Sequence, residues 1–162
     1  MSWDPAQYRL FSGHRLRPAL DLLAAIPLEA PGTVVDLGCG EGRVTRVLRD
    51  RWPDATLTAV DDSAAMLDVA AAELPHVDWR RGDIATWRPE APVDCLFSNA
   101  ALHWLPDHAT LFPDLFRSVA PGGVMAIQMP RNFDQPSHTT IHATVAEGPW
   151  KARLTPLVRR AP

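Results

Sequence analysis

Three glycines cluster in the segment VVDLGCGEGR, residues 34–43, which follows an apolar run and precedes helix-forming residues. Glycine adopts positive φ and has no Cβ, so such a cluster directly after a strand is typical of a turn pressed against a ligand. Gly38, Gly40 and Gly42 could instead serve a tight strand-to-helix connection with no ligand, and this segment alone leaves that alternative open.

The spacing of these glycines narrows the kind of ligand. It is G-x-G-x-G rather than the G-x-G-x-x-G of a dinucleotide site, and Asp36 stands just before the first glycine. A carboxylate there would repel a pyrophosphate but could hold an ammonium group, directly or through water. Asp61 lies 19 residues after Gly42, where a carboxylate can accept the hydroxyls of a ribose. A cationic amino-acid end and a ribose together indicate S-adenosylmethionine.

The elements that must position these residues alternate along the chain. A helix is predicted near residues 17–27, with Leu20, Leu23 and Ala24 on one face, and another is marked by Phe112, Phe116 and Val119. Strand-like runs stand at 33–37, 55–60, 77–81, 93–99 and 124–129. Alternating strands and helices imply right-handed crossovers, so we expect an open, doubly wound α/β domain with a mostly parallel sheet.

In such a sheet the ligand lies beyond the carboxyl ends of the strands. Asp61 ends the second predicted strand, Asp83 follows the third, and Asn99 follows the fourth. Each aspartate could merely cap a helix or form a turn. Their common placement with the glycines predicts one binding crevice.

Composition excludes several classes of function. The 162 residues carry 16 Lys+Arg and 19 Asp+Glu, a net charge of −3, which is unsuited to nucleic acid. No apolar run reaches the roughly 18 residues of a membrane span, so we expect no membrane partner and a cytoplasmic location. Cys39 and Cys95 fit no metal spacing and are predicted to be reduced apolar side chains.

Several motifs carry a family resemblance. VVDLGCGEG, AVDDSAAML and RGDIATW resemble the glycine-rich, ribose-binding and adenine-binding motifs of the class I S-adenosylmethionine-dependent methyltransferases, a Rossmann-like family. FSNAALHWLPDHATLFPDLF and PGGVMAIQMPRNFDQPSH are more specific, and resemble the trans-aconitate 2-methyltransferases. This second resemblance runs from Trp3 to the last residue.

The resemblance implies an enzyme that transfers a methyl group to a carboxylate of a small tricarboxylic acid, giving a monomethyl ester and S-adenosylhomocysteine. A carboxylate is already an anionic nucleophile at neutral pH, so no catalytic acid or base is expected. The matching cofactor-binding positions are Asp36, Gly38, Gly40, Gly42, Asp61, Met66, Asp83, Ile84 and Asn99.

A polyanionic substrate needs counter-charges. Arg15 and Arg17 are the candidates, because arginine forks match carboxylates, although both could lie on an exposed helix face. His103 and Trp104 follow the fourth strand, where a substrate wall would be, and His103 could equally be a packing residue.

The resembled fold adds two strands after a lid-like insertion, so the chain is expected to lack the last two strands. The resemblance divides the chain into an N-terminal helical lid (1–31), a cofactor-binding core (32–130) and the start of a substrate lid (131–162). An uncovered apolar strand at 124–129 would then favour self-association. Two alternatives stay open: a truncated, non-catalytic fragment that binds the cofactor, and a methyltransferase for another small molecule.

Overall fold

The computed structural model of the protein describes residues 12–132 and 134–158, with side chains from residue 16 onward. These residues form two compact units that divide between Met129 and Pro130. The division lies one residue from the predicted boundary at 130. The role of either end of the chain as a lid stays a prediction.

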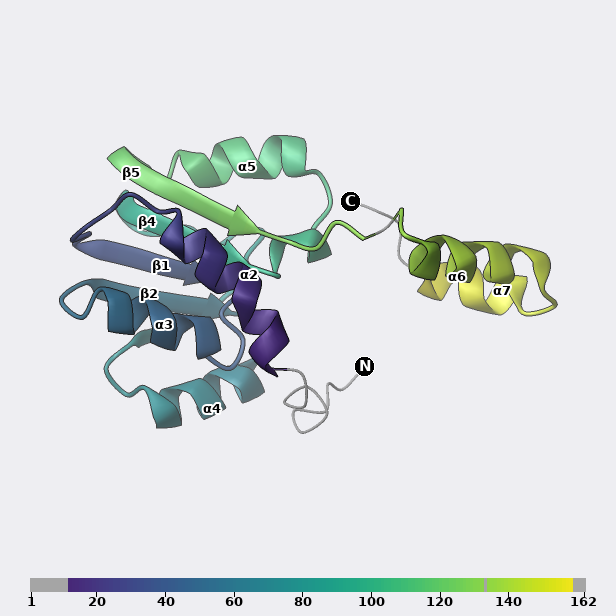
Figure 1. Ribbon diagram of the computed structural model, residues 1–162, viewed down its shortest axis with the longest axis horizontal. Coiled ribbons are helices and arrows are strands. Elements are labelled where there is room, and N and C mark those ends of the chain that lie inside the picture. Colours follow the sequence, from purple (N-terminus) through teal and green to yellow (C-terminus); the bar gives the residue numbers. More distant parts are fainter. Residues whose placement is uncertain (1–11, 133, 159–162) are drawn as a thin grey trace. The chain divides into compact units, whose positions relative to one another are not determined.

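The first unit contains a five-stranded sheet in the order β3-β2-β1-β4-β5, in which every neighbouring pair is parallel (Figure 1). The strands are β1 (Thr33–Leu37), β2 (Thr56–Asp61), β3 (Asp78–Arg81), β4 (Val93–Asn99) and β5 (Val119–Gln128). The winding reverses between the central strands β1 and β4, which confirms the predicted open, doubly wound α/β class. β5 begins earlier than predicted, because Val119 pairs with Val93 ahead of a register shift.

Helices cover both faces of this sheet (Figure 1). One face packs on α2 (Ser12–Ala24), α3 (Arg43–Arg51) and α4 (Ala64–Glu73), which contribute Ala19, Leu23, Leu48 and Leu67 to a first apolar cluster. The other face packs on α5 (His108–Phe116), which contributes Leu111 and Leu115 to a second cluster. Successive side chains of β1 point to opposite faces of the sheet, so Val34 enters the first cluster and Val35 enters the second.

Two predicted helical faces are wrong in detail. In α2 the buried residues are Ala19 and Leu23, whereas Leu20 is 40% exposed and Ala24 is exposed. In α5 the i, i+4 pair Leu111 and Leu115 faces the sheet, so Phe116 is 59% exposed. Apolar residues on both sides of these helices made the buried face ambiguous from spacing alone.

The predicted exposure of strand 124–129 is also wrong for its side chains. Ala126 is buried, while Val124, Met125 and Ile127 are half-buried. α2 and α5 both contact β5, and its side chains join the two apolar clusters. In the described sheet, no further strand pairs with the outer backbone edge of β5.

The second unit, Pro130–Pro162, is helical: α6 (Pro136–Glu147), α7 (Lys151–Leu154) and a 3₁₀ turn η2 (Thr155–Leu157). Val145 is buried, and the Trp150 indole donates to the Thr144 carbonyl at 3.0 Å. Ile141, Trp150 and Leu157 nevertheless leave large apolar surfaces exposed. Across the described ranges of both units, no helix has the length and apolar character that crossing a membrane would need.

Candidate functional site

The glycine loop that follows β1 is shaped by left-handed backbone. Gly38, Gly40 and Gly42 have φ of 82°, 55° and 79°. A Cβ on Gly38 would lie 2.2 Å from the Cβ of Ala101, so this glycine lets the loop touch the segment after β4. A Cβ on Gly42 would meet the Trp79 ring at 2.7 Å. Two of the three glycines are therefore required by packing within the protein itself.

Gly40 differs from Gly38 and Gly42, because no atom of the described residues lies within 4 Å of the position its Cβ would take. Open space beside a left-handed glycine is the geometry expected where a ligand approaches the backbone. The structure thus assigns Gly38 and Gly42 to tight packing within the protein, while the predicted approach of a ligand at Gly40 stays a prediction.

Asp61 ties this loop to the end of β2. Its Oδ2 accepts the Gly40 N–H at 2.8 Å and its Oδ1 accepts the Ser63 N–H at 3.0 Å. Each carboxylate oxygen has two lone pairs, so both oxygens can still accept a ligand hydroxyl. Ser63 is the N-cap of α4, but its side chain makes no capping hydrogen bond. The carboxylate of Asp61 holds the turn there.

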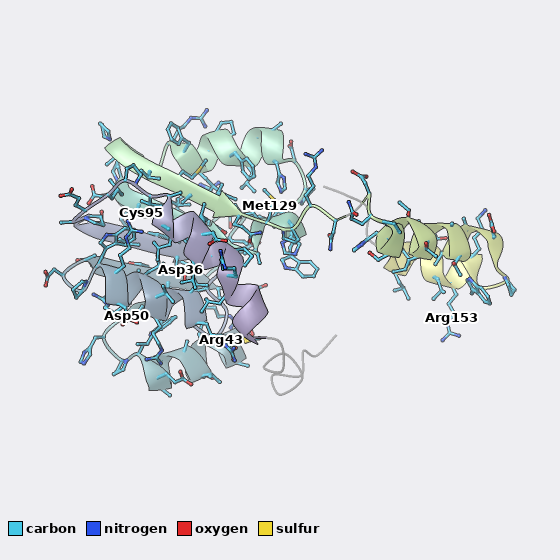
Figure 2. All side chains as sticks on the ribbon, in the orientation of Figure 1. Asp36, Arg43, Asp50, Cys95, Met129 and Arg153 are labelled. Atoms are coloured by element: carbon cyan, nitrogen blue, oxygen red, sulfur yellow. The ribbon has the colours of Figure 1, made fainter. Side chains whose placement is uncertain are left out.

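Asp36 lies at 1% exposure on β1, marked in Figure 2, and its Oδ2 accepts the Thr45 hydroxyl at 2.6 Å. The pKa of Asp36 is raised to about 7, chiefly by burial and also by the charge of Asp61, while the Thr45 hydrogen bond acts to lower it. A buried carboxyl with this pKa gains most from a cationic partner. Its expected role as an ammonium contact stays a prediction.

The end of β4 supplies a strained and incompletely bonded segment. Ala100 has φ of 53°, which is unusual for a residue with a Cβ and costs on the order of 1–3 kcal/mol. Its N–H donates to the Gln128 carbonyl at 2.8 Å, which fixes the turn. The adjacent Asn99 Oδ1 is buried and has no hydrogen-bond partner among the described residues. Such an atom calls for an explanation, and a ligand donor would provide one.

Of the remaining cofactor candidates, Ile84 lies beside the glycine loop. The Ile84 Cδ1 lies 3.7 Å from the Cβ position of Gly38, so Ile84 lines the same turn. Asp83 is exposed, and its Oδ1 accepts the Ala85 N–H at 2.9 Å, which is the turn-forming role considered for it above. Met66 is half-buried in the first turn of α4.

The four predicted substrate-binding residues differ in their surroundings. Arg17 is exposed and its Nε donates to both Asp21 oxygens, at 2.7 and 2.9 Å. The side chain of Arg15 lies outside the described residues. His103 and Trp104 stand together on the 3₁₀ turn η1 (Leu102–Trp104) with ring centroids 4.6 Å apart, and Trp104 is 45% exposed.

Sequence reasoning missed Thr45 and Ala101. Thr45 is fully buried, and it lies three residues before the fully buried Leu48 on the same face of α3. That spacing was visible in the sequence. The contact of Ala101 with Gly38 depends on how β1 and β4 align in the sheet, and the sequence alone does not give that alignment. Both cysteines are free and buried, and burial raises the pKa of each thiol.

Comparison with known proteins defines the class. Residues 34–123 match the family model described as a methyltransferase domain, so the chain belongs to that family. The match begins on β1 and ends within β5, and it includes the glycine loop and the ends of β2 and β4.

Its curated relatives are trans-aconitate 2-methyltransferases. The protein of that name from Azoarcus sp. (strain BH72) is 54% identical over 153 residues, which is 94% of this chain and 60% of the relative. The one from Yersinia pestis (strain Pestoides F) is 48% identical over 152 residues, covering 94% of this chain and 59% of the relative. The chain thus spans about three fifths of the length of the curated relatives it matches.

Solved structures agree on the fold. The DhpI-SAM-HEP complex is 27% identical with a TM-score of 0.66, and the match covers 88% of this chain and 65% of that one. An S-adenosylmethionine dependent methyltransferase from Mesorhizobium loti is 29% identical with a TM-score of 0.62, covering 70% of this chain and 54% of that one.

Proposed function

We propose that the chain binds S-adenosylmethionine at the carboxyl ends of β1, β2 and β4. Two observations support the fit: the open space beside Gly40, and the buried Asn99 Oδ1 that lacks a partner among the described residues. Asp61 has lone pairs left for ribose hydroxyls after bonding Gly40 and Ser63. Asp36 supplies the carboxyl for the ammonium group. Met66, Asp83 and Ile84 would flank the adenosine.

The proposed substrate is trans-aconitate, and the product is its monomethyl ester. The observation that carries this assignment is 54% identity over 94% of the chain to a relative named trans-aconitate 2-methyltransferase. Arg15 and Arg17 would neutralise substrate carboxylates, and His103 and Trp104 would form a wall beside the methyl group.

The cofactor, when bound, supplies a methyl group on a sulfonium. A carboxylate oxygen of the substrate would accept this methyl group: the O–CH₃ bond would form as the S–CH₃ bond breaks, with the bonding electron pair left on sulfur. The substrate oxygen is already anionic at neutral pH, so the chain need not remove a proton. Its residues act by holding the two partners in line and by excluding water, which can be worth several kcal/mol.

A second candidate is cofactor binding without turnover. It is favoured by one fact: about two fifths of the length of the relatives has no counterpart in these 162 residues. The two candidates differ in a single assay. The purified chain is incubated with S-adenosylmethionine labelled in its methyl group, with and without trans-aconitate, while calorimetry follows the binding of S-adenosylhomocysteine.

Transfer of label to trans-aconitate supports the enzyme, and binding without transfer supports the second candidate. The absence of both would overturn the proposed function. Citrate, a saturated tricarboxylate, and an aliphatic monocarboxylate serve as comparison substrates, because they separate recognition of three charges from recognition of any carboxylate.

A further inference from the structure

Thr45 is a buried polar residue whose hydroxyl makes a hydrogen bond to Asp36. It lies in α3 at 0% exposure, and its hydroxyl donates to Asp36 Oδ2 at 2.6 Å. A hydroxyl buried among apolar side chains is costly unless it is hydrogen-bonded. Ser98 also has a buried hydroxyl, which donates instead to the Leu37 carbonyl at 2.7 Å. Thr45 therefore serves Asp36 specifically, rather than the backbone.

The surroundings of Asp36 contain little else that favours its charge. On the flanking strands its register partners are the apolar residues Ala59 and Phe97. The titratable groups coupled to it are Asp61 at the end of β2, Cys39 in the glycine loop and Cys95 on β4. Arg51 of α3 acts to lower the pKa of Cys95, and its guanidinium donates to the carbonyls of Leu23 in α2 and of Ile26 after it. Among the described groups that shift the pKa of Asp36, only Thr45 acts to lower it.

We propose that Thr45 is a positioning residue: its hydroxyl orients the Asp36 carboxylate for the ammonium group of S-adenosylmethionine. This inference rests on the proposed function. The hydrogen bond occupies Oδ2 from the α3 side of the sheet, and so fixes the rotation of the carboxyl group before the cofactor arrives. The same bond favours the ionised form, which is the form that attracts an ammonium group.

The test compares three proteins of full length: the wild type, Thr45→Val and Thr45→Ser. Valine has the shape of threonine without the hydroxyl, and serine keeps the hydroxyl without the methyl group. Calorimetry with S-adenosylhomocysteine is repeated from about pH 6 to about pH 8, a range that brackets the titration of Asp36. The ligand's own titration is common to all three proteins, so differences between them report on the protein.

We expect T45V to lower affinity at pH 7 by about tenfold, because a hydrogen bond to a charged group is lost. Its affinity should recover as pH rises, with the pH profile displaced upward by roughly one unit, since the unsupported carboxyl ionises later. T45S should follow the wild-type profile. Should T45V fail to give a cooperative thermal melt, Thr45→Ala carries the same expectation without the branched methyl group.

If the wild type binds the ligand and T45V shows the same affinity and the same pH profile, this inference is overturned while the proposed function stands. A loss in T45V that is the same at every pH, and that serine does not repair, would also overturn it, because packing and not the hydroxyl would then be responsible. No binding by the wild type would overturn the proposed function, and this inference with it.

Discussion

The carboxylate of Asp61 accepts the N–H of Gly40 at 2.8 Å, which joins the end of β2 to the open position of the glycine loop. The same carboxylate holds the first turn of α4 through the Ser63 N–H. One side chain thus fixes the backbone on two sides of the space proposed for the ribose.

Asp61→Ala should weaken S-adenosylhomocysteine binding by about 1.5–3 kcal/mol, the usual loss for hydrogen bonds to a charged group. It should also lower the melting temperature, because two backbone donors lose their acceptor. The matched control is Asp62→Ala, which removes an exposed neighbouring carboxylate. Calorimetry and thermal melting separate the effects, and equal affinity in D61A and D62A would refute the placement.

The glycines should divide into structural and ligand-facing positions. Gly38→Ala places a Cβ 2.2 Å from that of Ala101, so we expect a large loss of stability, seen as a lower midpoint in urea. Gly40→Ala meets no atom of the described part of the chain within 4 Å and should cost only the roughly 1–2 kcal/mol of left-handed backbone. Its added methyl group should lower cofactor affinity about tenfold. A G40A chain that binds normally would show that the ligand lies elsewhere.

Asp36 should make the chain less stable as pH rises. Its pKa is about 7 in the folded protein against 3.8 as the ordinary value, so between these pH values the folded state holds more protons than the unfolded state. The free energy of unfolding therefore falls from about pH 4 to about pH 7, by roughly 1.4 kcal/mol per pH unit, and this contribution is constant above pH 7.

Asp36→Asn isolates this contribution, because the difference between the two proteins removes the titration of all other groups. Urea unfolding near pH 5 and near pH 7.5 should show the mutant gaining stability relative to the wild type at the higher pH. Parallel stability profiles in the two proteins would contradict the assignment.

Arg17 offers a test of the substrate side, provided that the chain turns over. Its ion pair with Asp21 is exposed, and such pairs contribute at most about 1 kcal/mol, so Arg17→Ala should leave stability nearly unchanged. The KM for trans-aconitate should rise while cofactor affinity is retained. Asp21→Ala is the control, since it breaks the same pair but keeps the cation. If the KM for trans-aconitate rises equally in both variants, the Arg17–Asp21 ion pair supports the structure and Arg17 does not bind the substrate directly.

The outer edge of β5 is the predicted site of self-association. The opposite edge strand, β3, carries Asp78, Arg80 and Arg81, and charges of this kind blunt edge-to-edge pairing. β5 presents no charged residue within Val119–Gln128. Its side chains are partly covered, so we expect an ordinary cooperative melt together with concentration-dependent association. A monodisperse monomer at every concentration in light scattering would contradict this prediction.

The fold could be predicted from the sequence because the patterns that mark its strands and helices are local. Apolar runs such as TVVDL, bounded by Pro, Gly or charged residues, marked β1, β2, β4 and β5, and the alternation of strands with helices implied the parallel order. The side of a helix that faces the sheet was not accessible where apolar residues occur all round, as Leu20 and Phe116 show. The partial covering of β5 by α2 depended on contacts between segments that are roughly a hundred residues apart in the sequence.

The candidate site was accessible in outline for a similar reason. Asp36, Gly40 and Asp61 occur at strand ends, and parallel strands bring their carboxyl ends to one edge. Thr45 was missed because a threonine in a helix has many ordinary explanations. The unpartnered Asn99 Oδ1 and the left-handed Ala100 are properties of packing and backbone, and no residue pattern states them.

The central claim is that the cofactor binds where the glycine loop meets the ends of β2 and β4. The most direct measurement is amide NMR of the ¹⁵N-labelled 162-residue chain titrated with S-adenosylhomocysteine. We predict that the largest shifts occur at Gly40, Ser63 and Asn99, with Gly148 in the second unit unmoved. Saturable shifts centred on the second unit, or no shifts at a concentration of ligand that saturates a known methyltransferase, would contradict the account.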